Sequence, residues 1–208
     1  MKKILSGILP VLPTPYDSDN KIDCQAMESV VEFCIKSGAN GLVFPGSASE
    51  HDYLSLNERL KLLSVISVTN NQRLPIVYGV GKGNSLEIIE NIKLAKPYGI
   101  TAIMILLPAQ FSHEPEQAHQ FMADICTAYP EIDIVLQNAP QPIGAELSPE
   151  VIASIIATLP NVKYIKEEAL PSGARITKSL KLAPKHLQGV IGGGACYLID
   201  EMKRGAIA

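Results

Sequence analysis

The residues best suited to chemistry lie around Lys166, at the end of the apolar run Val162-Lys163-Tyr164-Ile165-Lys166. This run predicts a short buried β-strand, the sixth in a chain that alternates strand-like and helix-like segments. In a β/α barrel the carboxyl ends of the strands form the active site. A lysine desolvated there loses its proton more readily, and its neutral amine can attack a ketone. Lys166 is therefore predicted to be a Schiff-base nucleophile.

Two carboxylates, Glu167 and Glu168, follow Lys166 directly. Adjacent strand residues point to opposite faces, so Glu168 shares a face with Lys166 if the strand continues that far. A carboxylate there favours the charged lysine, which opposes nucleophilic attack, but it could also serve as the general acid and base. The plainer alternatives are a solvated lysine, as expected for Lys163, and one salt-bridged glutamate beside one exposed glutamate.

The elements that position Lys166 follow from the hydrophobic pattern. Each strand-like run is almost entirely apolar instead of alternating, which is typical of parallel strands covered on both faces. Ser55 with Glu58 predicts a capping box, and Ser148 before Pro149 predicts a helix start. The predicted strands span residues 7–12, 41–45, 75–80, 102–107, 133–138, 162–166 and 187–192. The predicted helices span residues 23–37, 56–69, 85–96, 115–128, 149–158, 174–181 and 195–204.

Seven strand–helix units predict either an α/β barrel or a doubly wound sheet. The first strand is followed by no GxGxxG motif, and prolines crowd its end, which disfavours a dinucleotide-binding sheet. We therefore predict a single domain over residues 1–208, a (β/α)8 TIM barrel that lacks most of the eighth strand and everything after it. Residues 206–208 would begin the eighth strand, and a complete barrel typically has about 250 residues.

The composition excludes several classes of protein. The chain is 47% hydrophobic, so it can bury a substantial core. Its formal net charge is −3 with both signs interspersed, and this charge pattern suggests neither a nucleic-acid groove nor binding to a membrane surface. The longest apolar runs are strand-sized and too short to span a bilayer. Four widely spaced cysteines without a CxxC pair indicate neither a zinc site nor a disulfide framework. We expect a cytoplasmic protein.

Several stretches together resemble the dihydrodipicolinate synthase / N-acetylneuraminate lyase family of class I aldolase-like Schiff-base barrels. The resemblance covers the whole chain, and it is specific only when the stretches are taken jointly. They are Pro13-Thr14-Pro15-Tyr16 after the first strand, Gly46-Ser47-Ala48-Ser49-Glu50 after the second, Asn138-Ala139-Pro140 after the fifth, Tyr164-Ile165-Lys166-Glu167, and Gly192-Gly193-Gly194 after the seventh.

This resemblance implies a lyase or dehydratase that acts on pyruvate or a 2-oxo-3-deoxy sugar acid by aldol cleavage, condensation or dehydration. It implies that Lys166 forms the Schiff base and that Ser47 and Ala48 belong to the loop that binds the 2-oxo acid carboxylate. It implies that Gly192 and Gly193 let the substrate approach the backbone closely. A small-molecule partner, no metal or organic cofactor, and a homotetramer are the further expectations.

One departure from the family pattern concerns proton transfer. Gln137 stands where the family usually has a catalytic tyrosine, and Ala109 and Gln110 stand in place of a tyrosine pair. An amide has no titratable proton, so Gln137 can bind a carboxylate but cannot shuttle protons. Three alternatives stay open. The chain could be an enzyme in which Glu168 or water moves protons, a non-catalytic or degenerate member that binds a 2-oxo acid without turnover, or a fragment of a longer working enzyme.

Overall fold

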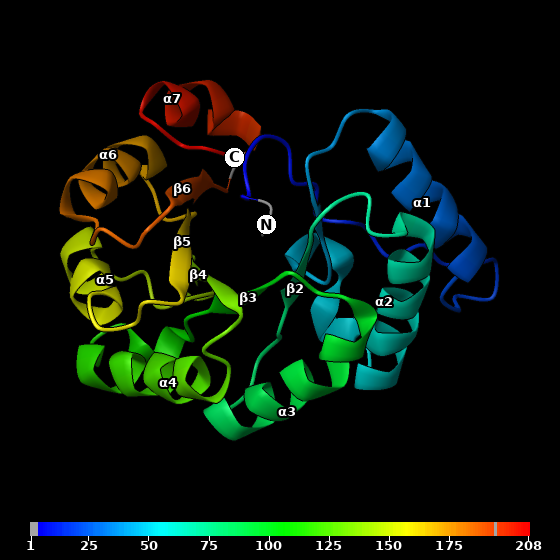
Figure 1. Ribbon diagram of the computed structural model, residues 1–208, viewed down its shortest axis with the longest axis horizontal. Helices are drawn as coiled ribbons and strands as arrows, with labels where there is room; N and C mark the ends of the chain where they lie inside the picture. The colour runs from blue at the N-terminus through cyan, green and yellow to red at the C-terminus, as the bar shows by residue number, and fades with distance from the viewer. Residues whose placement is uncertain (1–3, 194) are drawn as a thin grey trace. The chain divides into compact units, whose positions relative to one another are not determined.

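The computed structural model describes residues 4–193 and 195–208 (Figure 1). The chain forms two compact units. The first extends to Gly81 and also includes Glu90–Ile103, and the second consists of Lys82–Ile89 and Met104–Ala208. The division passes through helix α3 (Ser85–Ala95) and strand β3 (Ala102–Leu106). The prediction of a single domain over residues 1–208 stays a prediction.

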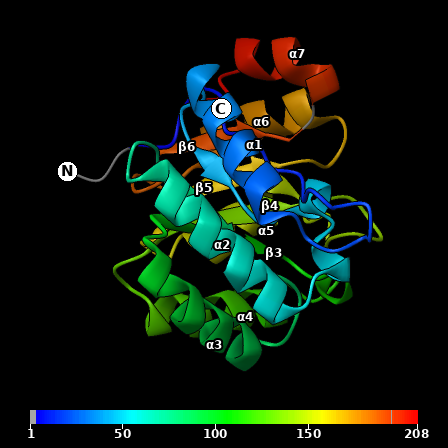
Figure 2. The ribbon, with the colours of Figure 1, turned by 90° about the vertical axis from the view of Figure 1, so that its right-hand side faces the viewer.

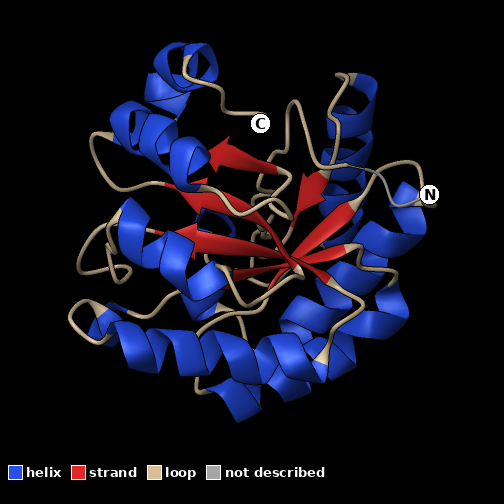
Figure 3. Cartoon of the chain, turned by 60° about the vertical axis from the view of Figure 1, so that its left-hand side comes forward, coloured by secondary structure: helices blue, strands red, loops and turns tan. Residues whose placement is uncertain are grey.

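In the described residues, six strands follow one another in chain order in the sheet. Figure 3 shows the strands in red and the helices in blue. The strands run parallel wherever a register is defined, between β1 and β2 and from β4 through β5 to β6. Their residues are almost all buried, as the continuous apolar runs predict. Besides β3, the strands are β1 (Leu42–Val43), β2 (Ile76–Gly79), β4 (Asp133–Asn138), β5 (Val162–Glu167) and β6 (Gly189–Gly192).

The first predicted strand, residues 7–12, is the main correction to the predicted elements. It contributes only an isolated parallel bridge between Val11 and Val43. The Leu12 N–H donates to the Val43 carbonyl at 3.0 Å, and the Val43 N–H donates to the Pro10 carbonyl at 3.0 Å. Pro10 and Pro13 have no N–H to donate, so a regular ladder cannot extend along this segment.

Helices α1 (Cys24–Lys36) and α2 (Leu56–Asn70) lie side by side in the first unit (Figures 1 and 2). The α2 capping box is confirmed: the Ser55 N–H donates to Glu58 Oε2 at 2.8 Å, and the Glu58 N–H donates to Ser55 Oγ at 3.3 Å. Short 3-10 turns η1 (Ser47–Ser49) and η2 (His51–Tyr53) connect β1 to α2.

In the second unit the helices follow one another around strands β4 to β6 (Figure 1). Ser148 caps α5 as predicted, because its Oγ accepts from the Val151 N–H at 3.3 Å. The last helix is shorter than the predicted span of residues 195–204, since Ala195–Tyr197 form a 3-10 turn instead. The helices are α4 (Pro115–Ala128), α5 (Pro149–Ile156), α6 (Ser172–Leu182) and α7 (Leu198–Lys203).

Residues 206–208 lie along the free side of β6. The Ile207 N–H donates to the Val190 carbonyl at 2.9 Å, and the Gly192 N–H donates to the Ala208 carbonyl at 2.8 Å. These bonds agree with the prediction that a further strand begins here. Within the described part of the chain, no helix is both long enough and apolar enough to cross a bilayer.

Candidate active site at the ends of strands β4 and β5

Lys166 is the second-last residue of β5. In the parallel register it lies opposite Gln137 of β4 and Ile191 of β6. The two residues before it, Tyr164 and Ile165, are buried. The Lys166 side chain is 14% exposed. The strand therefore holds this amine at the carboxyl end of the sheet, nearly buried but within reach of a solute.

A carboxylate and an amide contact each other beside the Lys166 amine. Lys166 Nζ lies 3.0 Å from Glu168 Oε1, and Gln137 Nε2 donates to Glu168 Oε2 at 2.5 Å. The Glu168 N–H also donates to the Asn138 carbonyl at 2.9 Å, which continues the β4–β5 pairing one residue beyond β5. Glu168 thus shares the face of Lys166, as the strand alternation predicts.

This ion pair has a clear chemical consequence. The nucleophilic form of Lys166 is the neutral amine, so the ammonium has to lose a proton before it can attack a ketone. The Glu168 carboxylate is in contact with the proton that has to leave. The arrangement can therefore remove a proton from Lys166 without the help of a distant base.

The two glycines predicted to bind substrate both lie against acidic side chains. A Cβ added to Gly193 would sit 2.0 Å from Glu168 Cγ, and a Cβ added to Gly192 would sit 2.1 Å from Glu201 Oε2. Glu201 is buried and accepts a hydrogen bond from Ser172 Oγ at 2.6 Å. Gly193 is thus required where the Glu168 side chain passes, and its contact with substrate stays a prediction.

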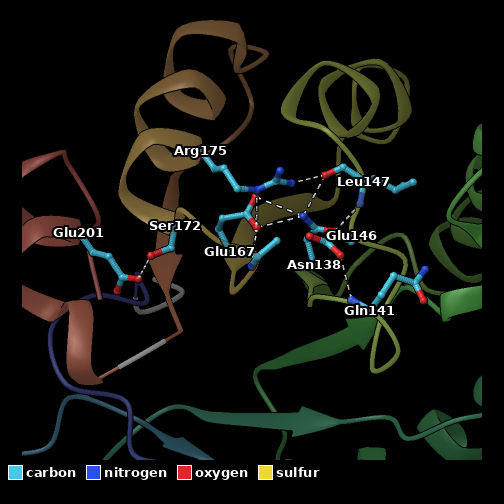
Figure 4. Close-up of polar contacts among 9 residues, drawn as sticks. Asn138, Gln141, Glu146, Leu147, Glu167, Ser172, Arg175 and Glu201 are labelled. Carbon is cyan, nitrogen blue, oxygen red and sulfur yellow. Dashed lines mark hydrogen bonds and ion pairs between the residues drawn. The ribbon is translucent and has the colours of Figure 1, made fainter.

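Strand alternation places a second group of the same chemical types on the opposite face of the two strands. Figure 4 shows its members Asn138, Glu167 and Arg175. Glu167 is fully buried, and its carboxylate accepts from Asn138 Nδ2 at 3.0 and 3.2 Å and from the Ala169 N–H at 3.0 Å. Arg175 Nε lies 3.2 Å from Glu167 Oε1. Burial raises the pKa of the Glu167 carboxyl, although the Arg175 charge and the hydrogen bonds oppose that rise.

Asn138 and Arg175 also hold the loop that follows β4 (Figure 4). Asn138 Nδ2 donates to the Leu147 carbonyl at 3.1 Å, the Leu147 N–H donates to Asn138 Oδ1 at 2.9 Å, and Arg175 donates to the same carbonyl. The expectation of one salt-bridged and one exposed glutamate is wrong, because both carboxylates are ion-paired on opposite faces. Sequence reasoning missed Arg175, since no spacing rule links a helix arginine to a strand-end glutamate.

Ser47 and Ala48 belong to the first unit, in the turn η1. Both are exposed, while the neighbouring Ser49 is buried. Ser49 Oγ donates to the Leu12 carbonyl at 2.6 Å and accepts from the Gly46 N–H at 3.0 Å, so Ser49 ties the loop to the preceding segment. The carboxylate-binding role of Ser47 and Ala48 stays a prediction.

The fold and the site define the class of protein, an α/β protein of the TIM-barrel type. Its strands follow one another in chain order, helices connect successive strands, and a lysine lies at the end of β5. The family model described as "Dihydrodipicolinate synthetase family" matches residues 4–206 of the chain. The chain therefore belongs to this family, whose members are Schiff-base lyases. The family expected from the sequence motifs is confirmed.

Curated relatives and solved structures agree with this assignment. The chain is 30% identical over 207 residues to the 4-hydroxy-tetrahydrodipicolinate synthase of Acidobacterium capsulatum, covering 98% of the chain and 65% of the relative. It is 29% identical over 185 residues to that of Bacillus subtilis, covering 89% of the chain and 63% of the relative. The chain thus spans somewhat less than two thirds of the length of these relatives.

The fold is shared with the E. coli K12 prophage protein YagE, a member of the dihydrodipicolinic acid synthase family solved in complex with pyruvate. The TM-score is 0.89 at 21% identity, and the match covers 99% of this chain and 69% of that one. This likeness confirms the predicted fold class, a TIM barrel that is present only in part.

Proposed function

We propose that this chain is a Schiff-base lyase or dehydratase acting on pyruvate or a 2-oxo-3-deoxy sugar acid, with Lys166 as the nucleophile. The observation that supports it most strongly is the position of the Lys166 amine, nearly buried at the end of β5 and 3.0 Å from a carboxylate that can take its proton. The neutral amine attacks C2 of the 2-oxo acid. The resulting iminium withdraws electrons, so that a C–C bond is cleaved or formed or a β-substituent is lost.

The remaining roles in the proposal rest partly on family membership and, for Gln137 and Glu168, on the chemistry of the residues in this chain. Ser47, with the backbone N–H of Ala48, binds the substrate carboxylate, and Gly192 and Gly193 admit the substrate close to the backbone. Gln137 orients the substrate carboxylate or a water, and Glu168 or water moves protons. Assembly into a homotetramer and a cytoplasmic location are part of the same proposal.

Borohydride trapping tests the nucleophile. The chain is incubated with pyruvate and borohydride, and the adduct is located by intact mass and peptide mapping. We expect a single reduced pyruvyl adduct on Lys166 that is lost in Lys166→Ala and kept in Lys163→Ala, a matched change in the same strand. A folded sample that gives no adduct with pyruvate or with 2-oxo-3-deoxy acids contradicts the proposal.

A second candidate function is a 2-oxo acid binder without turnover. Gln137 favours it, because an amide has no titratable proton and stands where the family usually has a catalytic tyrosine. Titration calorimetry with pyruvate separates the two candidates. Heat of binding without an adduct on Lys166 indicates a binder, whereas an adduct together with product formation indicates the enzyme.

A further inference from the structure

We infer that Glu168 is the residue that takes the proton from Lys166, returns it to the leaving water and then serves as the counter-ion of the protonated imine, and that Gln137 acts through Glu168 as a positioning residue. The inference rests on the proposed Schiff-base role of Lys166. It replaces the choice between Glu168 and water by one named proton carrier, and it gives Gln137 a task other than substrate binding.

Two contacts hold the Glu168 carboxylate, and two features of the backbone direct its side chain. Oε1 lies 3.0 Å from Lys166 Nζ, and Oε2 accepts the 2.5 Å hydrogen bond from Gln137 Nε2. The Glu168 backbone N–H donates a hydrogen bond to the Asn138 carbonyl, so the side chain leaves the strand at a defined point. Gly193 leaves free the space through which this side chain passes, because any Cβ there would overlap Glu168 Cγ. A carboxylate held this way cannot swing away from the amine without losing the Gln137 bond.

The proton balance closes within this pair. The Lys166 ammonium transfers one proton to the Glu168 carboxylate, and the neutral amine then forms a bond to C2 while the carbonyl oxygen becomes an alkoxide. A second proton passes from the new C–N nitrogen to this oxygen, giving the carbinolamine. The Glu168 carboxylic acid then protonates the hydroxyl, the C–O bond breaks, and water leaves. The products are a protonated iminium, the Glu168 carboxylate and one water, with no net change of charge.

The buried group on the other face shows why only one of the two can work in this way. Asn138, Glu167 and Arg175 repeat the order amide, carboxylate and cation. Their cation is an arginine, which does not give up its proton in proteins, and Glu167 is fully buried. The Glu168 side chain is 23% exposed, and its cation is a lysine, which can give up a proton. Similar geometry therefore serves structure on one face and proton transfer on the other.

Gln137 cannot replace a tyrosine as a proton donor, but its amide can hold the residue that does. Loss of its Nε2–H group frees Glu168 Oε2 and lets the carboxylate leave the amine. The effect of changing Gln137 should therefore depend on Glu168 being present. A residue that contacted only the substrate, or that only supported the fold, would not show this dependence.

The test measures how fast pyruvate is trapped on Lys166 by cyanoborohydride, which reduces the protonated imine, across neutral and alkaline pH. In Glu168→Gln we expect trapping to slow by about 100-fold or more, because the general acid and base is lost. We also expect the alkaline fall in trapping to move down by about one pH unit, because the iminium loses its counter-ion. Glu150→Gln is the matched control, since Glu150 pairs with Lys178 at an exposed position, and its profile should equal that of the wild type.

Gln137→Met removes the amide at similar length. We expect a smaller loss in the same direction, and no further loss when Gln137→Met is added to Glu168→Gln. Glu168→Asp, which keeps the charge but shortens the reach, gives an intermediate profile and takes the place of Glu168→Gln if that variant does not fold.

The outcomes separate the two proposals. Wild-type trapping with an unchanged pH profile in Glu168→Gln, or in Glu168→Asp where only that variant folds, overturns the role of Glu168 and leaves the Schiff base standing. Equal losses for Gln137→Met with and without Glu168 overturn the positioning role. No trapping in folded wild-type protein overturns both proposals.

Discussion

Removing Arg175 should destabilise the protein strongly, because the partner it leaves behind is a fully buried carboxylate. Glu167 has no exposed surface, and Arg175 Nε lies 3.2 Å from its Oε1. At an effective dielectric constant of about 20, two unit charges 3.2 Å apart attract by about 5 kcal/mol. Release of the arginine from its own desolvation offsets part of this attraction.

Removal of one partner of a buried pair typically costs about 3 to 5 kcal/mol. Asn138 and the Ala169 N–H still donate to Glu167 after the change, so we expect the lower end of that range. Arg175→Met should therefore lower the free energy of unfolding by about 3 kcal/mol at neutral pH.

The loss should depend on pH with a defined sign. Burial raises the pKa of Glu167 even with Arg175 present, and without that cation the pKa rises further. A carboxyl whose pKa is higher in the folded than in the unfolded state contributes stability below its unfolded pKa, and this contribution is lost as the pH rises through the folded pKa. The deficit of Arg175→Met should thus be smaller in mildly acidic buffer than in neutral buffer.

Urea unfolding followed by circular dichroism at both pH values measures this deficit. Lys178→Met is the matched control, because it removes a cation from the same helix whose pairing with Glu150 is exposed, and we expect no loss beyond measurement error. The reasoning fails if Arg175→Met costs no more than Lys178→Met, or if its deficit is as large in acidic as in neutral buffer.

Three further predictions concern single side chains. Gly193→Ala should push Glu168 away from Lys166 and slow the trapping of pyruvate by cyanoborohydride by about tenfold or more. Circular dichroism should show that the fold is kept, and an unchanged trapping rate would contradict the packing of Gly193 on Glu168. Burial raises the pKa of Cys126 to about 12, so iodoacetamide at neutral pH should modify exposed Cys196 and leave Cys126 unlabelled, and peptide mass spectrometry showing equal labelling would refute this. Ser49→Ala removes two buried hydrogen bonds and should lower the free energy of unfolding by about 1 to 3 kcal/mol in urea titrations, and a value within error of wild type would refute its role in tying the loop.

Local physics explains which features could be predicted from the sequence. Apolar runs covered on both faces indicate strands, and the side chains of Ser55 and Glu58 satisfy the end of α2 with residues only three apart. The period of two in a strand places Glu168 on the side of Lys166. The failure at residues 7–12 is local as well, because prolines interrupt the donors that an apolar run otherwise supplies.

The partners of these residues were decided by the tertiary structure. Gln137 and Glu168 are 31 residues apart in the chain, and only the register of β4 against β5 brings the amide to the carboxylate. Arg175 reaches Glu167 because α6 packs beside β5, and Gly193 meets Glu168 because β6 pairs with β5. The sequence by itself determined which side chains could do chemistry and which face of the strand each one takes. Which carboxylate binds which cation, and which of the two pairs a solute can reach, depends on strand register and helix packing, because burial and distance between remote segments are properties of the folded chain.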